Sequence, residues 1–132
     1  MTEPTSPLEG VRVINAGQIL AAPYCSTLLG EFGAEVIKVE QPKLGDANRG
    51  NESFAQDNRG QKSVTLDFNH PDGKVLFRRL CDKADIRVEN FRPGTLEKWG
   101  LGQNSVRETT PGLVAVRISG WGQTGPYKDK GG

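Results

Sequence analysis

Three short segments of the 132-residue chain combine glycine or proline with polar and aromatic side chains, and each directly follows an apolar run. They span residues 17–23, 90–94 and 120–126, and Lys98 and Lys130 lie close to the last two in the sequence. Glycines let a backbone approach a ligand closely, and basic side chains form strong charge-assisted bonds to phosphate. The pattern favours a site for a phosphorylated, flexible cofactor, although unrelated surface lysines are a nearly equal interpretation.

The segment from Val11 to Glu40 predicts where the first of these three segments, residues 17–23, lies in the fold. An apolar run at 11–14 is followed by residues at helical spacing and then by a β-branched run at 36–39. Pro23 suits the first turn of the helix, and Gly33 suits a left-handed position just past its end. The pattern predicts a parallel βαβ unit whose first turn lies at the carboxyl edge of the sheet, where free backbone amides favour phosphate.

Some kinds of chemistry are disfavoured by the same residues. A dinucleotide fingerprint does not match, because Ile19, Leu20 and Ala22 stand where its further glycines would be needed. The single histidine, His70, lies at a helix start beside a proline, so we do not expect it to act as a catalytic base. An ordinary βαβ unit without any ligand therefore stays an alternative.

Strand and helix patterns alternate along the rest of the chain. Strand patterns occur at 63–67, 84–89 and 113–118, and the last run is continuous enough to predict a strand buried on both faces. Alternation of this kind predicts an α/β fold: a Rossmann-like, mostly parallel sheet flanked by helices, with ligands at the carboxyl ends of the strands.

Three helices are expected between these strands. The first has Asn69 as its candidate N-cap, and its apolar stripe is predicted to consist of Val75, Leu76, Leu80 and Cys81. Two shorter helices are expected, one capped by Thr95 and one starting at Asn104. The polar stretch 41–62 is predicted to be a long loop, which is either functional or a solvated surface segment.

Composition narrows the class of protein. The chain has 132 residues, of which 35% are hydrophobic and 25% charged, and this size and composition predict one domain. The net charge of +1 argues against nucleic-acid or membrane partners. Cys25 and Cys81 lack metal-ligand spacing and are expected to be buried, reduced thiols, which fits a cytoplasmic protein. No metal site is predicted.

The ends of the chain suggest how it is organised. Residues 1–8 are expected to form a polar tail, and residues 9–132 a partial Rossmann-like domain. The sequence stops directly after a glycine-rich loop, without a closing helix or strand. We therefore expect a fragment of a longer protein.

Four stretches of the sequence resemble the N-terminal part of class III CoA-transferases, the CaiB/BaiF family. They are LEGVRVINAGQILAAPYCSTLLGEFGAEVIKVEQPKLGD, NRGQKSVTLDFNHPDGK, ADIRVENFRPGTLEKWGLG and ISGWGQTGPY, in the family's order. The resemblance implies the large domain of that fold, an interlocked homodimer when full length, and coenzyme A or an acyl-CoA as substrate together with a small carboxylic acid. It also implies a CoA-binding role for domain 9–132.

The resemblance also implies which residues contact CoA. Carried over position by position, they are Leu20, Ala21, Gln41, Leu66, Asn69, Asn90, Phe91, Arg92 and Lys98. Gln41 stands where many members carry arginine, and Asn69 stands where many carry lysine, so Lys43, Arg49 and Lys62 are candidates to compensate. The family's catalytic aspartate is expected beyond Gly132, so no residue of this chain is assigned a catalytic role.

The resemblance implies transfer of CoA from an acyl-CoA to a carboxylic acid through an aspartyl anhydride. Two alternatives stay open. One is racemisation at the α-carbon of an acyl-CoA, as in the related α-methylacyl-CoA racemases, which needs a paired acid and base. The other is a non-catalytic CoA-binding module. By itself, this chain is expected to be inactive.

Overall fold

The structure is a computed structural model that describes residues 5–131. Its centre is a five-stranded sheet formed by β1 (Arg12–Asn15), β2 (Glu35–Glu40), β3 (Lys62–Thr65), β4 (Ile86–Glu89) and β5 (Val114–Arg117). All neighbouring strands are parallel, in the order β3-β2-β1-β4-β5. The predicted α/β fold with a parallel sheet is confirmed. The strand order reverses between β1 and β4, which creates a topological switch point at their carboxyl ends.

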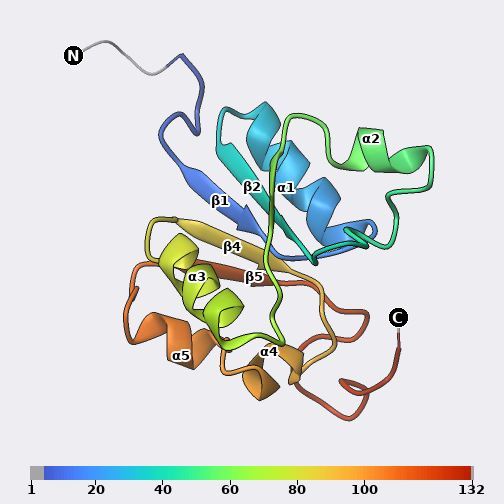
Figure 1. Cartoon of the computed structure of the whole chain (residues 1–132), viewed down its shortest axis with the longest axis vertical. Helices are drawn as coiled ribbons and strands as arrows, with labels where there is room; N and C mark the ends of the chain where they lie inside the picture. Colours follow the sequence, from blue (N-terminus) through green and yellow to red (C-terminus); the bar gives the residue numbers. More distant parts are fainter. Residues whose placement is uncertain (1–4, 132) are drawn as a thin grey trace.

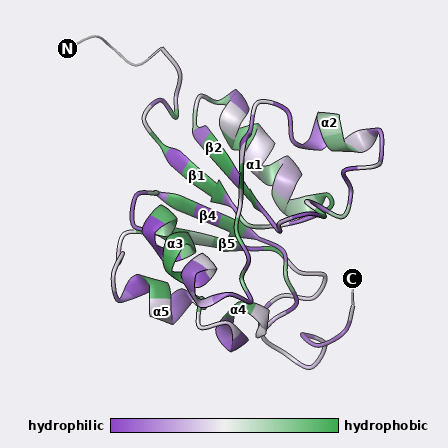
Figure 2. Ribbon diagram, viewed as in Figure 1, coloured by the Kyte–Doolittle hydropathy of each residue, from purple (hydrophilic) through white to green (hydrophobic). Residues whose placement is uncertain are grey.

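Helices cover both faces of the sheet (Figure 1). α1 (Ala21–Glu31) packs on one face, with α2 (Ser53–Asp57) beside it; α3 (Pro71–Cys81), α4 (Thr95–Lys98) and α5 (Gln103–Arg107) lie on the other. Figure 2 shows the hydrophobic residues concentrated in the central strands. Among the described residues, no helix is long and apolar enough to cross a membrane.

Each face of the sheet has its own apolar core, because side chains alternate along a strand. Val13, Val36 and Val88 point toward α1, and Ala22 of that helix completes the cluster. Ile14 and Val39 belong to the opposite core, whose other buried members include Phe77, Cys81, Leu96, Leu101 and Val106. Both cysteines are free: Cys81 is buried and Cys25 is half-buried.

The end of α1 confirms the expected left-handed glycine. Gly33 has a φ of 103°. Its N–H donates to Gly30 O at 2.9 Å, and the N–H of Ala34 donates to Leu29 O at 3.1 Å. These two bonds form a Schellman motif, which satisfies carbonyls that the helix end would leave unpaired. The chain therefore turns sharply from α1 into β2.

The start of α3 differs from the prediction. His70, and not Asn69, is the N-cap, and its Nδ1 accepts a bond from the N–H of Asp72 at 3.2 Å. The Asn69 N–H instead donates to the Asp67 carboxylate at 2.8 Å, in a tight turn before the helix. Both side chains suit a cap position, so the fold of the turn decided which one is used.

The predicted apolar stripe of α3 is also partly wrong. Val75 and Leu76 are 56% and 42% exposed, whereas Phe77 and Cys81 are fully buried. The stripe that faces the sheet is therefore Gly73, Phe77 and Cys81, at i, i+4 and i+8. Gly73 allows α3 to pack closely against the backbone of the turn before it, because a Cβ at this position would lie 1.9 Å from Asp67 O.

Four further expectations about elements are corrected. β5 is an edge strand and not a strand buried on both faces, since Val114 is 56% exposed. Gly94 with a φ of 86°, and not Thr95, is the N-cap of α4, and α5 starts at Gln103 after Gly102 instead of at Asn104. The predicted long loop contains α2 and several buried polar residues: Asp46, Asn48, Asp57 and Asn58.

The predicted tail is only partly described, since residues 1–4 and Gly132 lie outside the described residues. Leu8 belongs to the folded body, because its N–H donates to Phe32 O at 2.9 Å. The tail boundary stays a prediction.

Candidate functional site

A cleft of about 680 Å³ opens at the switch point, and we call it the switch-point cleft. The turn after β1 contributes Ile19, Leu20 and Ala21 to its wall. The segment after β4 contributes residues 90–93, and the segment after β5 contributes residues 118–120. The structure therefore brings together the three strand-end segments singled out in the sequence, at the place where open α/β sheets bind ligands.

A second, smaller cavity of about 110 Å³ adjoins the switch-point cleft and shares Phe91 with it. Three of the residues predicted to contact CoA line it: Gln41, Leu66 and Asn69. Aromatic rings form one side of this cavity: the ring centroid of Trp99 lies 5.4 Å from that of Phe91 and 5.5 Å from that of Phe68. Eight of the nine predicted contact residues thus line one of two adjoining cavities.

The ninth residue, Lys98, lies elsewhere. It is exposed at the end of α4 and lines neither cavity. Lys130 instead lines the switch-point cleft, and its Nζ lies 4.0 Å from the centre of the Tyr127 ring. Trp121 lies beside the cleft and is linked to its rim, because its indole N–H donates to Gly131 O at 3.2 Å.

The electrostatic character of the switch-point cleft is simple. Two side chains with a positive charge, Arg92 and Lys130, line it, and no aspartate or glutamate is among the described residues of its wall. Ile19, Leu20 and Phe91 provide apolar surface next to these charges. A wall of this kind suits a ligand that joins anionic groups to an apolar chain.

The backbone of the turn after β1 does not offer the free amides that the sequence suggested. The N–H of Gly17 donates to Asn15 Oδ1 at 3.0 Å, that of Gln18 to Asn90 Oδ1 at 2.8 Å, and that of Ile19 to the Asp46 carboxylate at 3.0 Å. Three consecutive amides are therefore occupied by side chains of the protein. The expected phosphate cradle is wrong at residues 17–19, because the nearby Asn15 and the distant Asp46 and Asn90 already accept these amides.

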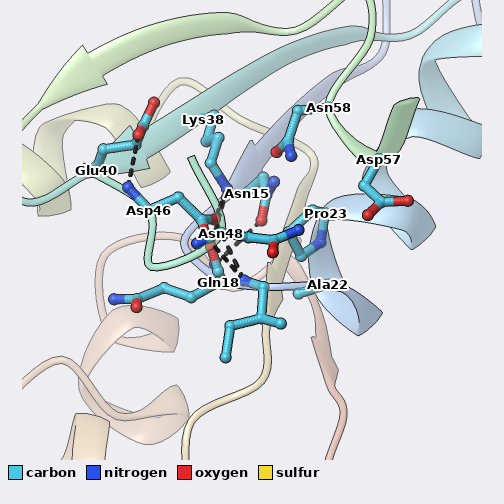
Figure 3. Close-up of polar contacts among 12 residues, drawn as sticks. Asn15, Gln18, Ala22, Pro23, Lys38, Glu40, Asp46, Asn48, Asp57 and Asn58 are labelled. Atoms are coloured by element: carbon cyan, nitrogen blue, oxygen red, sulfur yellow. Dashed lines mark hydrogen bonds and ion pairs between the residues drawn. The ribbon is translucent and has the colours of Figure 1, made fainter. Parts of the chain in front are cut away.

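Two residues of this arrangement were missed by the sequence analysis. Lys38 of β2 and Asp46 of the following loop form an ion pair at 2.6 Å, with side chains 2% and 0% exposed (Figure 3). The only signal was a lysine inside a β-branched strand pattern. Because lysines are almost never fully buried without a partner, a buried Lys38 would have predicted an acidic side chain close to it.

A second buried carboxylate, Glu40, supports the same loop. It accepts hydrogen bonds from Arg49 Nε and Nη2, both at 2.6 Å, from Ser63 Oγ at 2.6 Å and from the N–H of Asp46 at 2.8 Å. Burial alone would raise the pKa of Glu40, but the bonds from Arg49 and Ser63 outweigh it and lower the pKa to about 2. Glu40 therefore stays ionised and fixes the loop that carries Asp46.

These ion pairs bear on the cations that were candidates to compensate for Gln41 and Asn69. Arg49 is engaged by Glu40, and Lys62 pairs with Glu35 at 2.6 Å. Lys43 is exposed on the loop with a φ of 71°.

In the described residues, no group of three or more His, Cys, Asp or Glu side chains is arranged to hold a metal ion.

The fold and the cleft define an α/β domain with a candidate site at the switch point. A model of CoA-transferase family III matches residues 8–132, and the chain belongs to this family. The resemblance seen in the sequence is thereby confirmed.

Relatives with curated names agree with this assignment. The chain is 49% identical to the succinyl-CoA–L-malate CoA-transferase beta subunit of Chloroflexus aurantiacus, over 99% of this chain and 35% of the relative. It is 48% identical to the succinyl-CoA–D-citramalate CoA-transferase of the same organism, over 98% and 34%. A crystal structure of a CaiB/BaiF family protein from Brucella suis superposes with a TM-score of 0.92 at 38% identity, covering 96% of this chain and 37% of that one. The chain spans about a third of the length of these proteins.

Proposed function

We propose that the protein to which this chain belongs is a CoA-transferase that moves CoA from an acyl-CoA donor to a small carboxylic acid. The family supports the reaction class, and the names of two relatives pair succinyl-CoA with L-malate and with D-citramalate. Dicarboxylic acids are therefore the first acceptors to test.

The observation that carries the proposal is the switch-point cleft itself. CoA combines phosphates with a long, uncharged arm that has apolar parts, and the cleft combines Arg92 and Lys130 with apolar side chains. We assign the phosphates to these two cations. Residues 17–19 would meet a less polar part of the cofactor, because their amides are already bonded within the protein.

The remaining predicted contacts are assigned by position. Leu20, Ala21, Asn90 and Phe91 would line the CoA site in the switch-point cleft, and Gln41, Leu66 and Asn69 would extend it into the adjoining cavity. Lys98 is exposed outside both cavities, and its proposed contact is with a CoA phosphate that extends beyond them.

For the chemical step we propose an aspartate of the complete protein, beyond residue 132. Its carboxylate would attack the thioester carbon of the acyl-CoA, giving a mixed anhydride and the CoA thiolate, which then returns as nucleophile. Two acids of this chain are poor candidates for that role: Asp46 is buried and paired with Lys38, and Asp57 is buried at the C-terminal end of α2.

The setting of the enzyme is part of the same proposal. The sheet ends at both sides in exposed strands, since all four residues of β3 and Val114 of β5 are exposed. Such edges support completion by further polypeptide, and we propose an interlocked homodimer of the complete protein. The two free cysteines support a cytoplasmic location.

Incubation of the complete gene product with succinyl-CoA and L-malate or D-citramalate tests the reaction. We expect formation of the acceptor's CoA thioester, and a covalent enzyme adduct that hydroxylamine intercepts. Exchange of α-proton label in an acyl-CoA without any CoA transfer would instead identify a racemase. Binding of CoA without either reaction would identify a non-catalytic module.

The site is tested separately by calorimetric titration with CoA. Arg92→Ala and Lys130→Ala should each weaken binding and reduce its dependence on salt, because each removes a charge that salt screens. Lys128→Ala, an exposed lysine two residues earlier that does not line the cleft, is the matched control. Unchanged affinity in both cleft variants would remove the assignment.

A further inference from the structure

The buried ion pair of Lys38 and Asp46 holds the turn after β1 at two points. Lys38 Nζ donates to Gly17 O at 3.2 Å. The Asp46 carboxylate accepts the N–H of Ile19, with distances of 3.0 and 3.3 Å to its two oxygens. The buried ion pair therefore fixes the backbone of residues 17–19 (Figure 3).

The conformation that this pair holds is an unusual one. Ile19 has a φ of 67°, in the left-handed region that β-branched residues rarely adopt. A strained residue persists only where its surroundings determine its conformation, and such residues gather at ligand sites. Here the surroundings are the hydrogen bond that the Ile19 N–H donates to Asp46 and the two hydrogen bonds between Asn90 and the backbone of Gln18. The result is that Ile19 and Leu20, 55% and 54% exposed, line the switch-point cleft.

The pair is poorly explained as a device for stability alone. Removing two charges from water is costly, and well-packed apolar residues of similar volume often replace a buried ion pair without loss of stability. Asp46 is also held in place itself, since its N–H donates to Glu40 and its Oδ1 accepts from the N–H of Asn48 at 2.8 Å. The network thus orients one carboxylate toward one amide of the turn.

We infer that Lys38 and Asp46 are positioning residues for ligand binding: their ion pair sets the backbone of residues 17–19 and so presents Ile19 and Leu20 to the switch-point cleft. The inference rests on the proposed CoA site in that cleft. Neither residue lines the cleft, so both act through the turn.

Two double variants of the complete gene product separate positioning from folding. Lys38→Met with Asp46→Leu removes both charges and the acceptor for the Ile19 amide. Lys38→Met with Asp46→Asn removes both charges but keeps an acceptor oxygen. Arg59→Met is the matched control, because Arg59 forms an exposed ion pair with Glu31 at the far end of α1.

Calorimetric titration with CoA, together with thermal unfolding, gives the first measurement. We expect the Met/Leu variant to remain folded and its Kd for CoA to rise about tenfold or more, since small misplacements of a site are costly. In the Met/Asn variant the Kd should rise less, about three- to fivefold, because the bond to Ile19 can re-form but Lys38 no longer holds Gly17 O. The salt dependence should be unchanged in both, since Arg92 and Lys130 are intact.

Hydrogen exchange of a peptide covering residues 15–23 gives a second measurement that needs no ligand. Exchange should be slow in the wild type and the control, faster in the Met/Asn variant, which lacks the ion pair and the bond to Gly17 O, and fastest in the Met/Leu variant. If Met/Leu does not fold, the Met/Asn variant decides: folded, with binding and exchange as in the wild type, it overturns the inference.

Other results are equally decisive. A folded Met/Leu variant that binds CoA within about twofold of the wild type overturns the inference and leaves the proposed function intact. A wild-type protein that binds no CoA overturns the proposed function, and the exchange measurement still shows whether the pair holds the turn.

Discussion

The side-chain amide of Asn90 forms two hydrogen bonds with the backbone of Gln18: Oδ1 accepts the N–H and Nδ2 donates to the C=O, both at 2.8 Å. The two residues are 72 positions apart, at the carboxyl ends of β1 and β4. This pairing joins the two strand ends at the switch point. It makes Asn90 a part of the cleft's framework as well as of its wall.

Asn90→Asp should destabilise the protein, because a carboxylate oxygen would replace the donor that faces Gln18 O. We expect a loss of about 1–3 kcal/mol in the free energy of unfolding, measured by urea denaturation. Asn104→Asp is the control, at an exposed position in the first turn of α5, where an added negative charge is tolerated. Equal stability of the two variants would contradict a framework role for Asn90.

Gly17→Ala should be costly for a steric reason. A Cβ at Gly17 would lie 2.2 Å from Ala22 Cβ and 2.5 Å from Asn90 Oδ1, so the turn and α1 would have to move apart. We expect destabilisation of about 1–3 kcal/mol in thermal unfolding. Gly112→Ala meets no atom within 4 Å and should change stability by no more than about 0.5 kcal/mol. A neutral Gly17→Ala would show that the strand ends are less tightly joined.

Glu40→Gln should change how stability depends on pH. The pKa of Glu40 is lowered from 4.5 to about 2 in the folded protein, so its carboxylate contributes stability above pH 4.5 and loses that contribution as the pH falls through 2. Wild type should therefore be the more stable protein at pH 6, and the difference should shrink toward pH 2. Glu52→Gln, at an exposed position just before α2, controls for net charge. A difference independent of pH would refute the role of the ionised carboxylate.

Cys81 should resist thiol reagents in the folded protein. Burial raises its pKa to about 11 and closes it to solvent, and the thiolate is the reactive form. In a Cys25→Ser variant, which leaves Cys81 as the single thiol, mass spectrometry should find little labelling at pH 8 until urea unfolds the chain. Labelling at the same rate in the folded and unfolded protein would show that the core around α3 opens readily.

Local signals predicted most of the framework. The β-branched run at 36–39 marked β2, and Gly33 marked the end of α1, because strand propensity and the left-handed glycine act within a few residues. The three strand-end segments were predicted to share one edge, because parallel strands place their carboxyl ends together. That placement needs only the order of elements along the chain.

Other features depended on contacts that no local pattern contains. The choice of His70 over Asn69 as the cap of α3 followed from the turn at Asp67. The exposure of β5 followed from its place at the edge of the sheet, since a continuous apolar run reads the same in either place.

The sequence by itself determined the α/β class and the segments that meet at the switch point, because hydrophobic periodicity and turn residues act over short distances. The family followed from the resemblance of four sequence stretches to its members. Only the tertiary structure decided that the amides of residues 17–19 are occupied and that Lys38 and Asp46 are buried together. The physical reason is that a buried polar group must find a partner in space. For Gln18 that partner comes from a strand end 72 residues away.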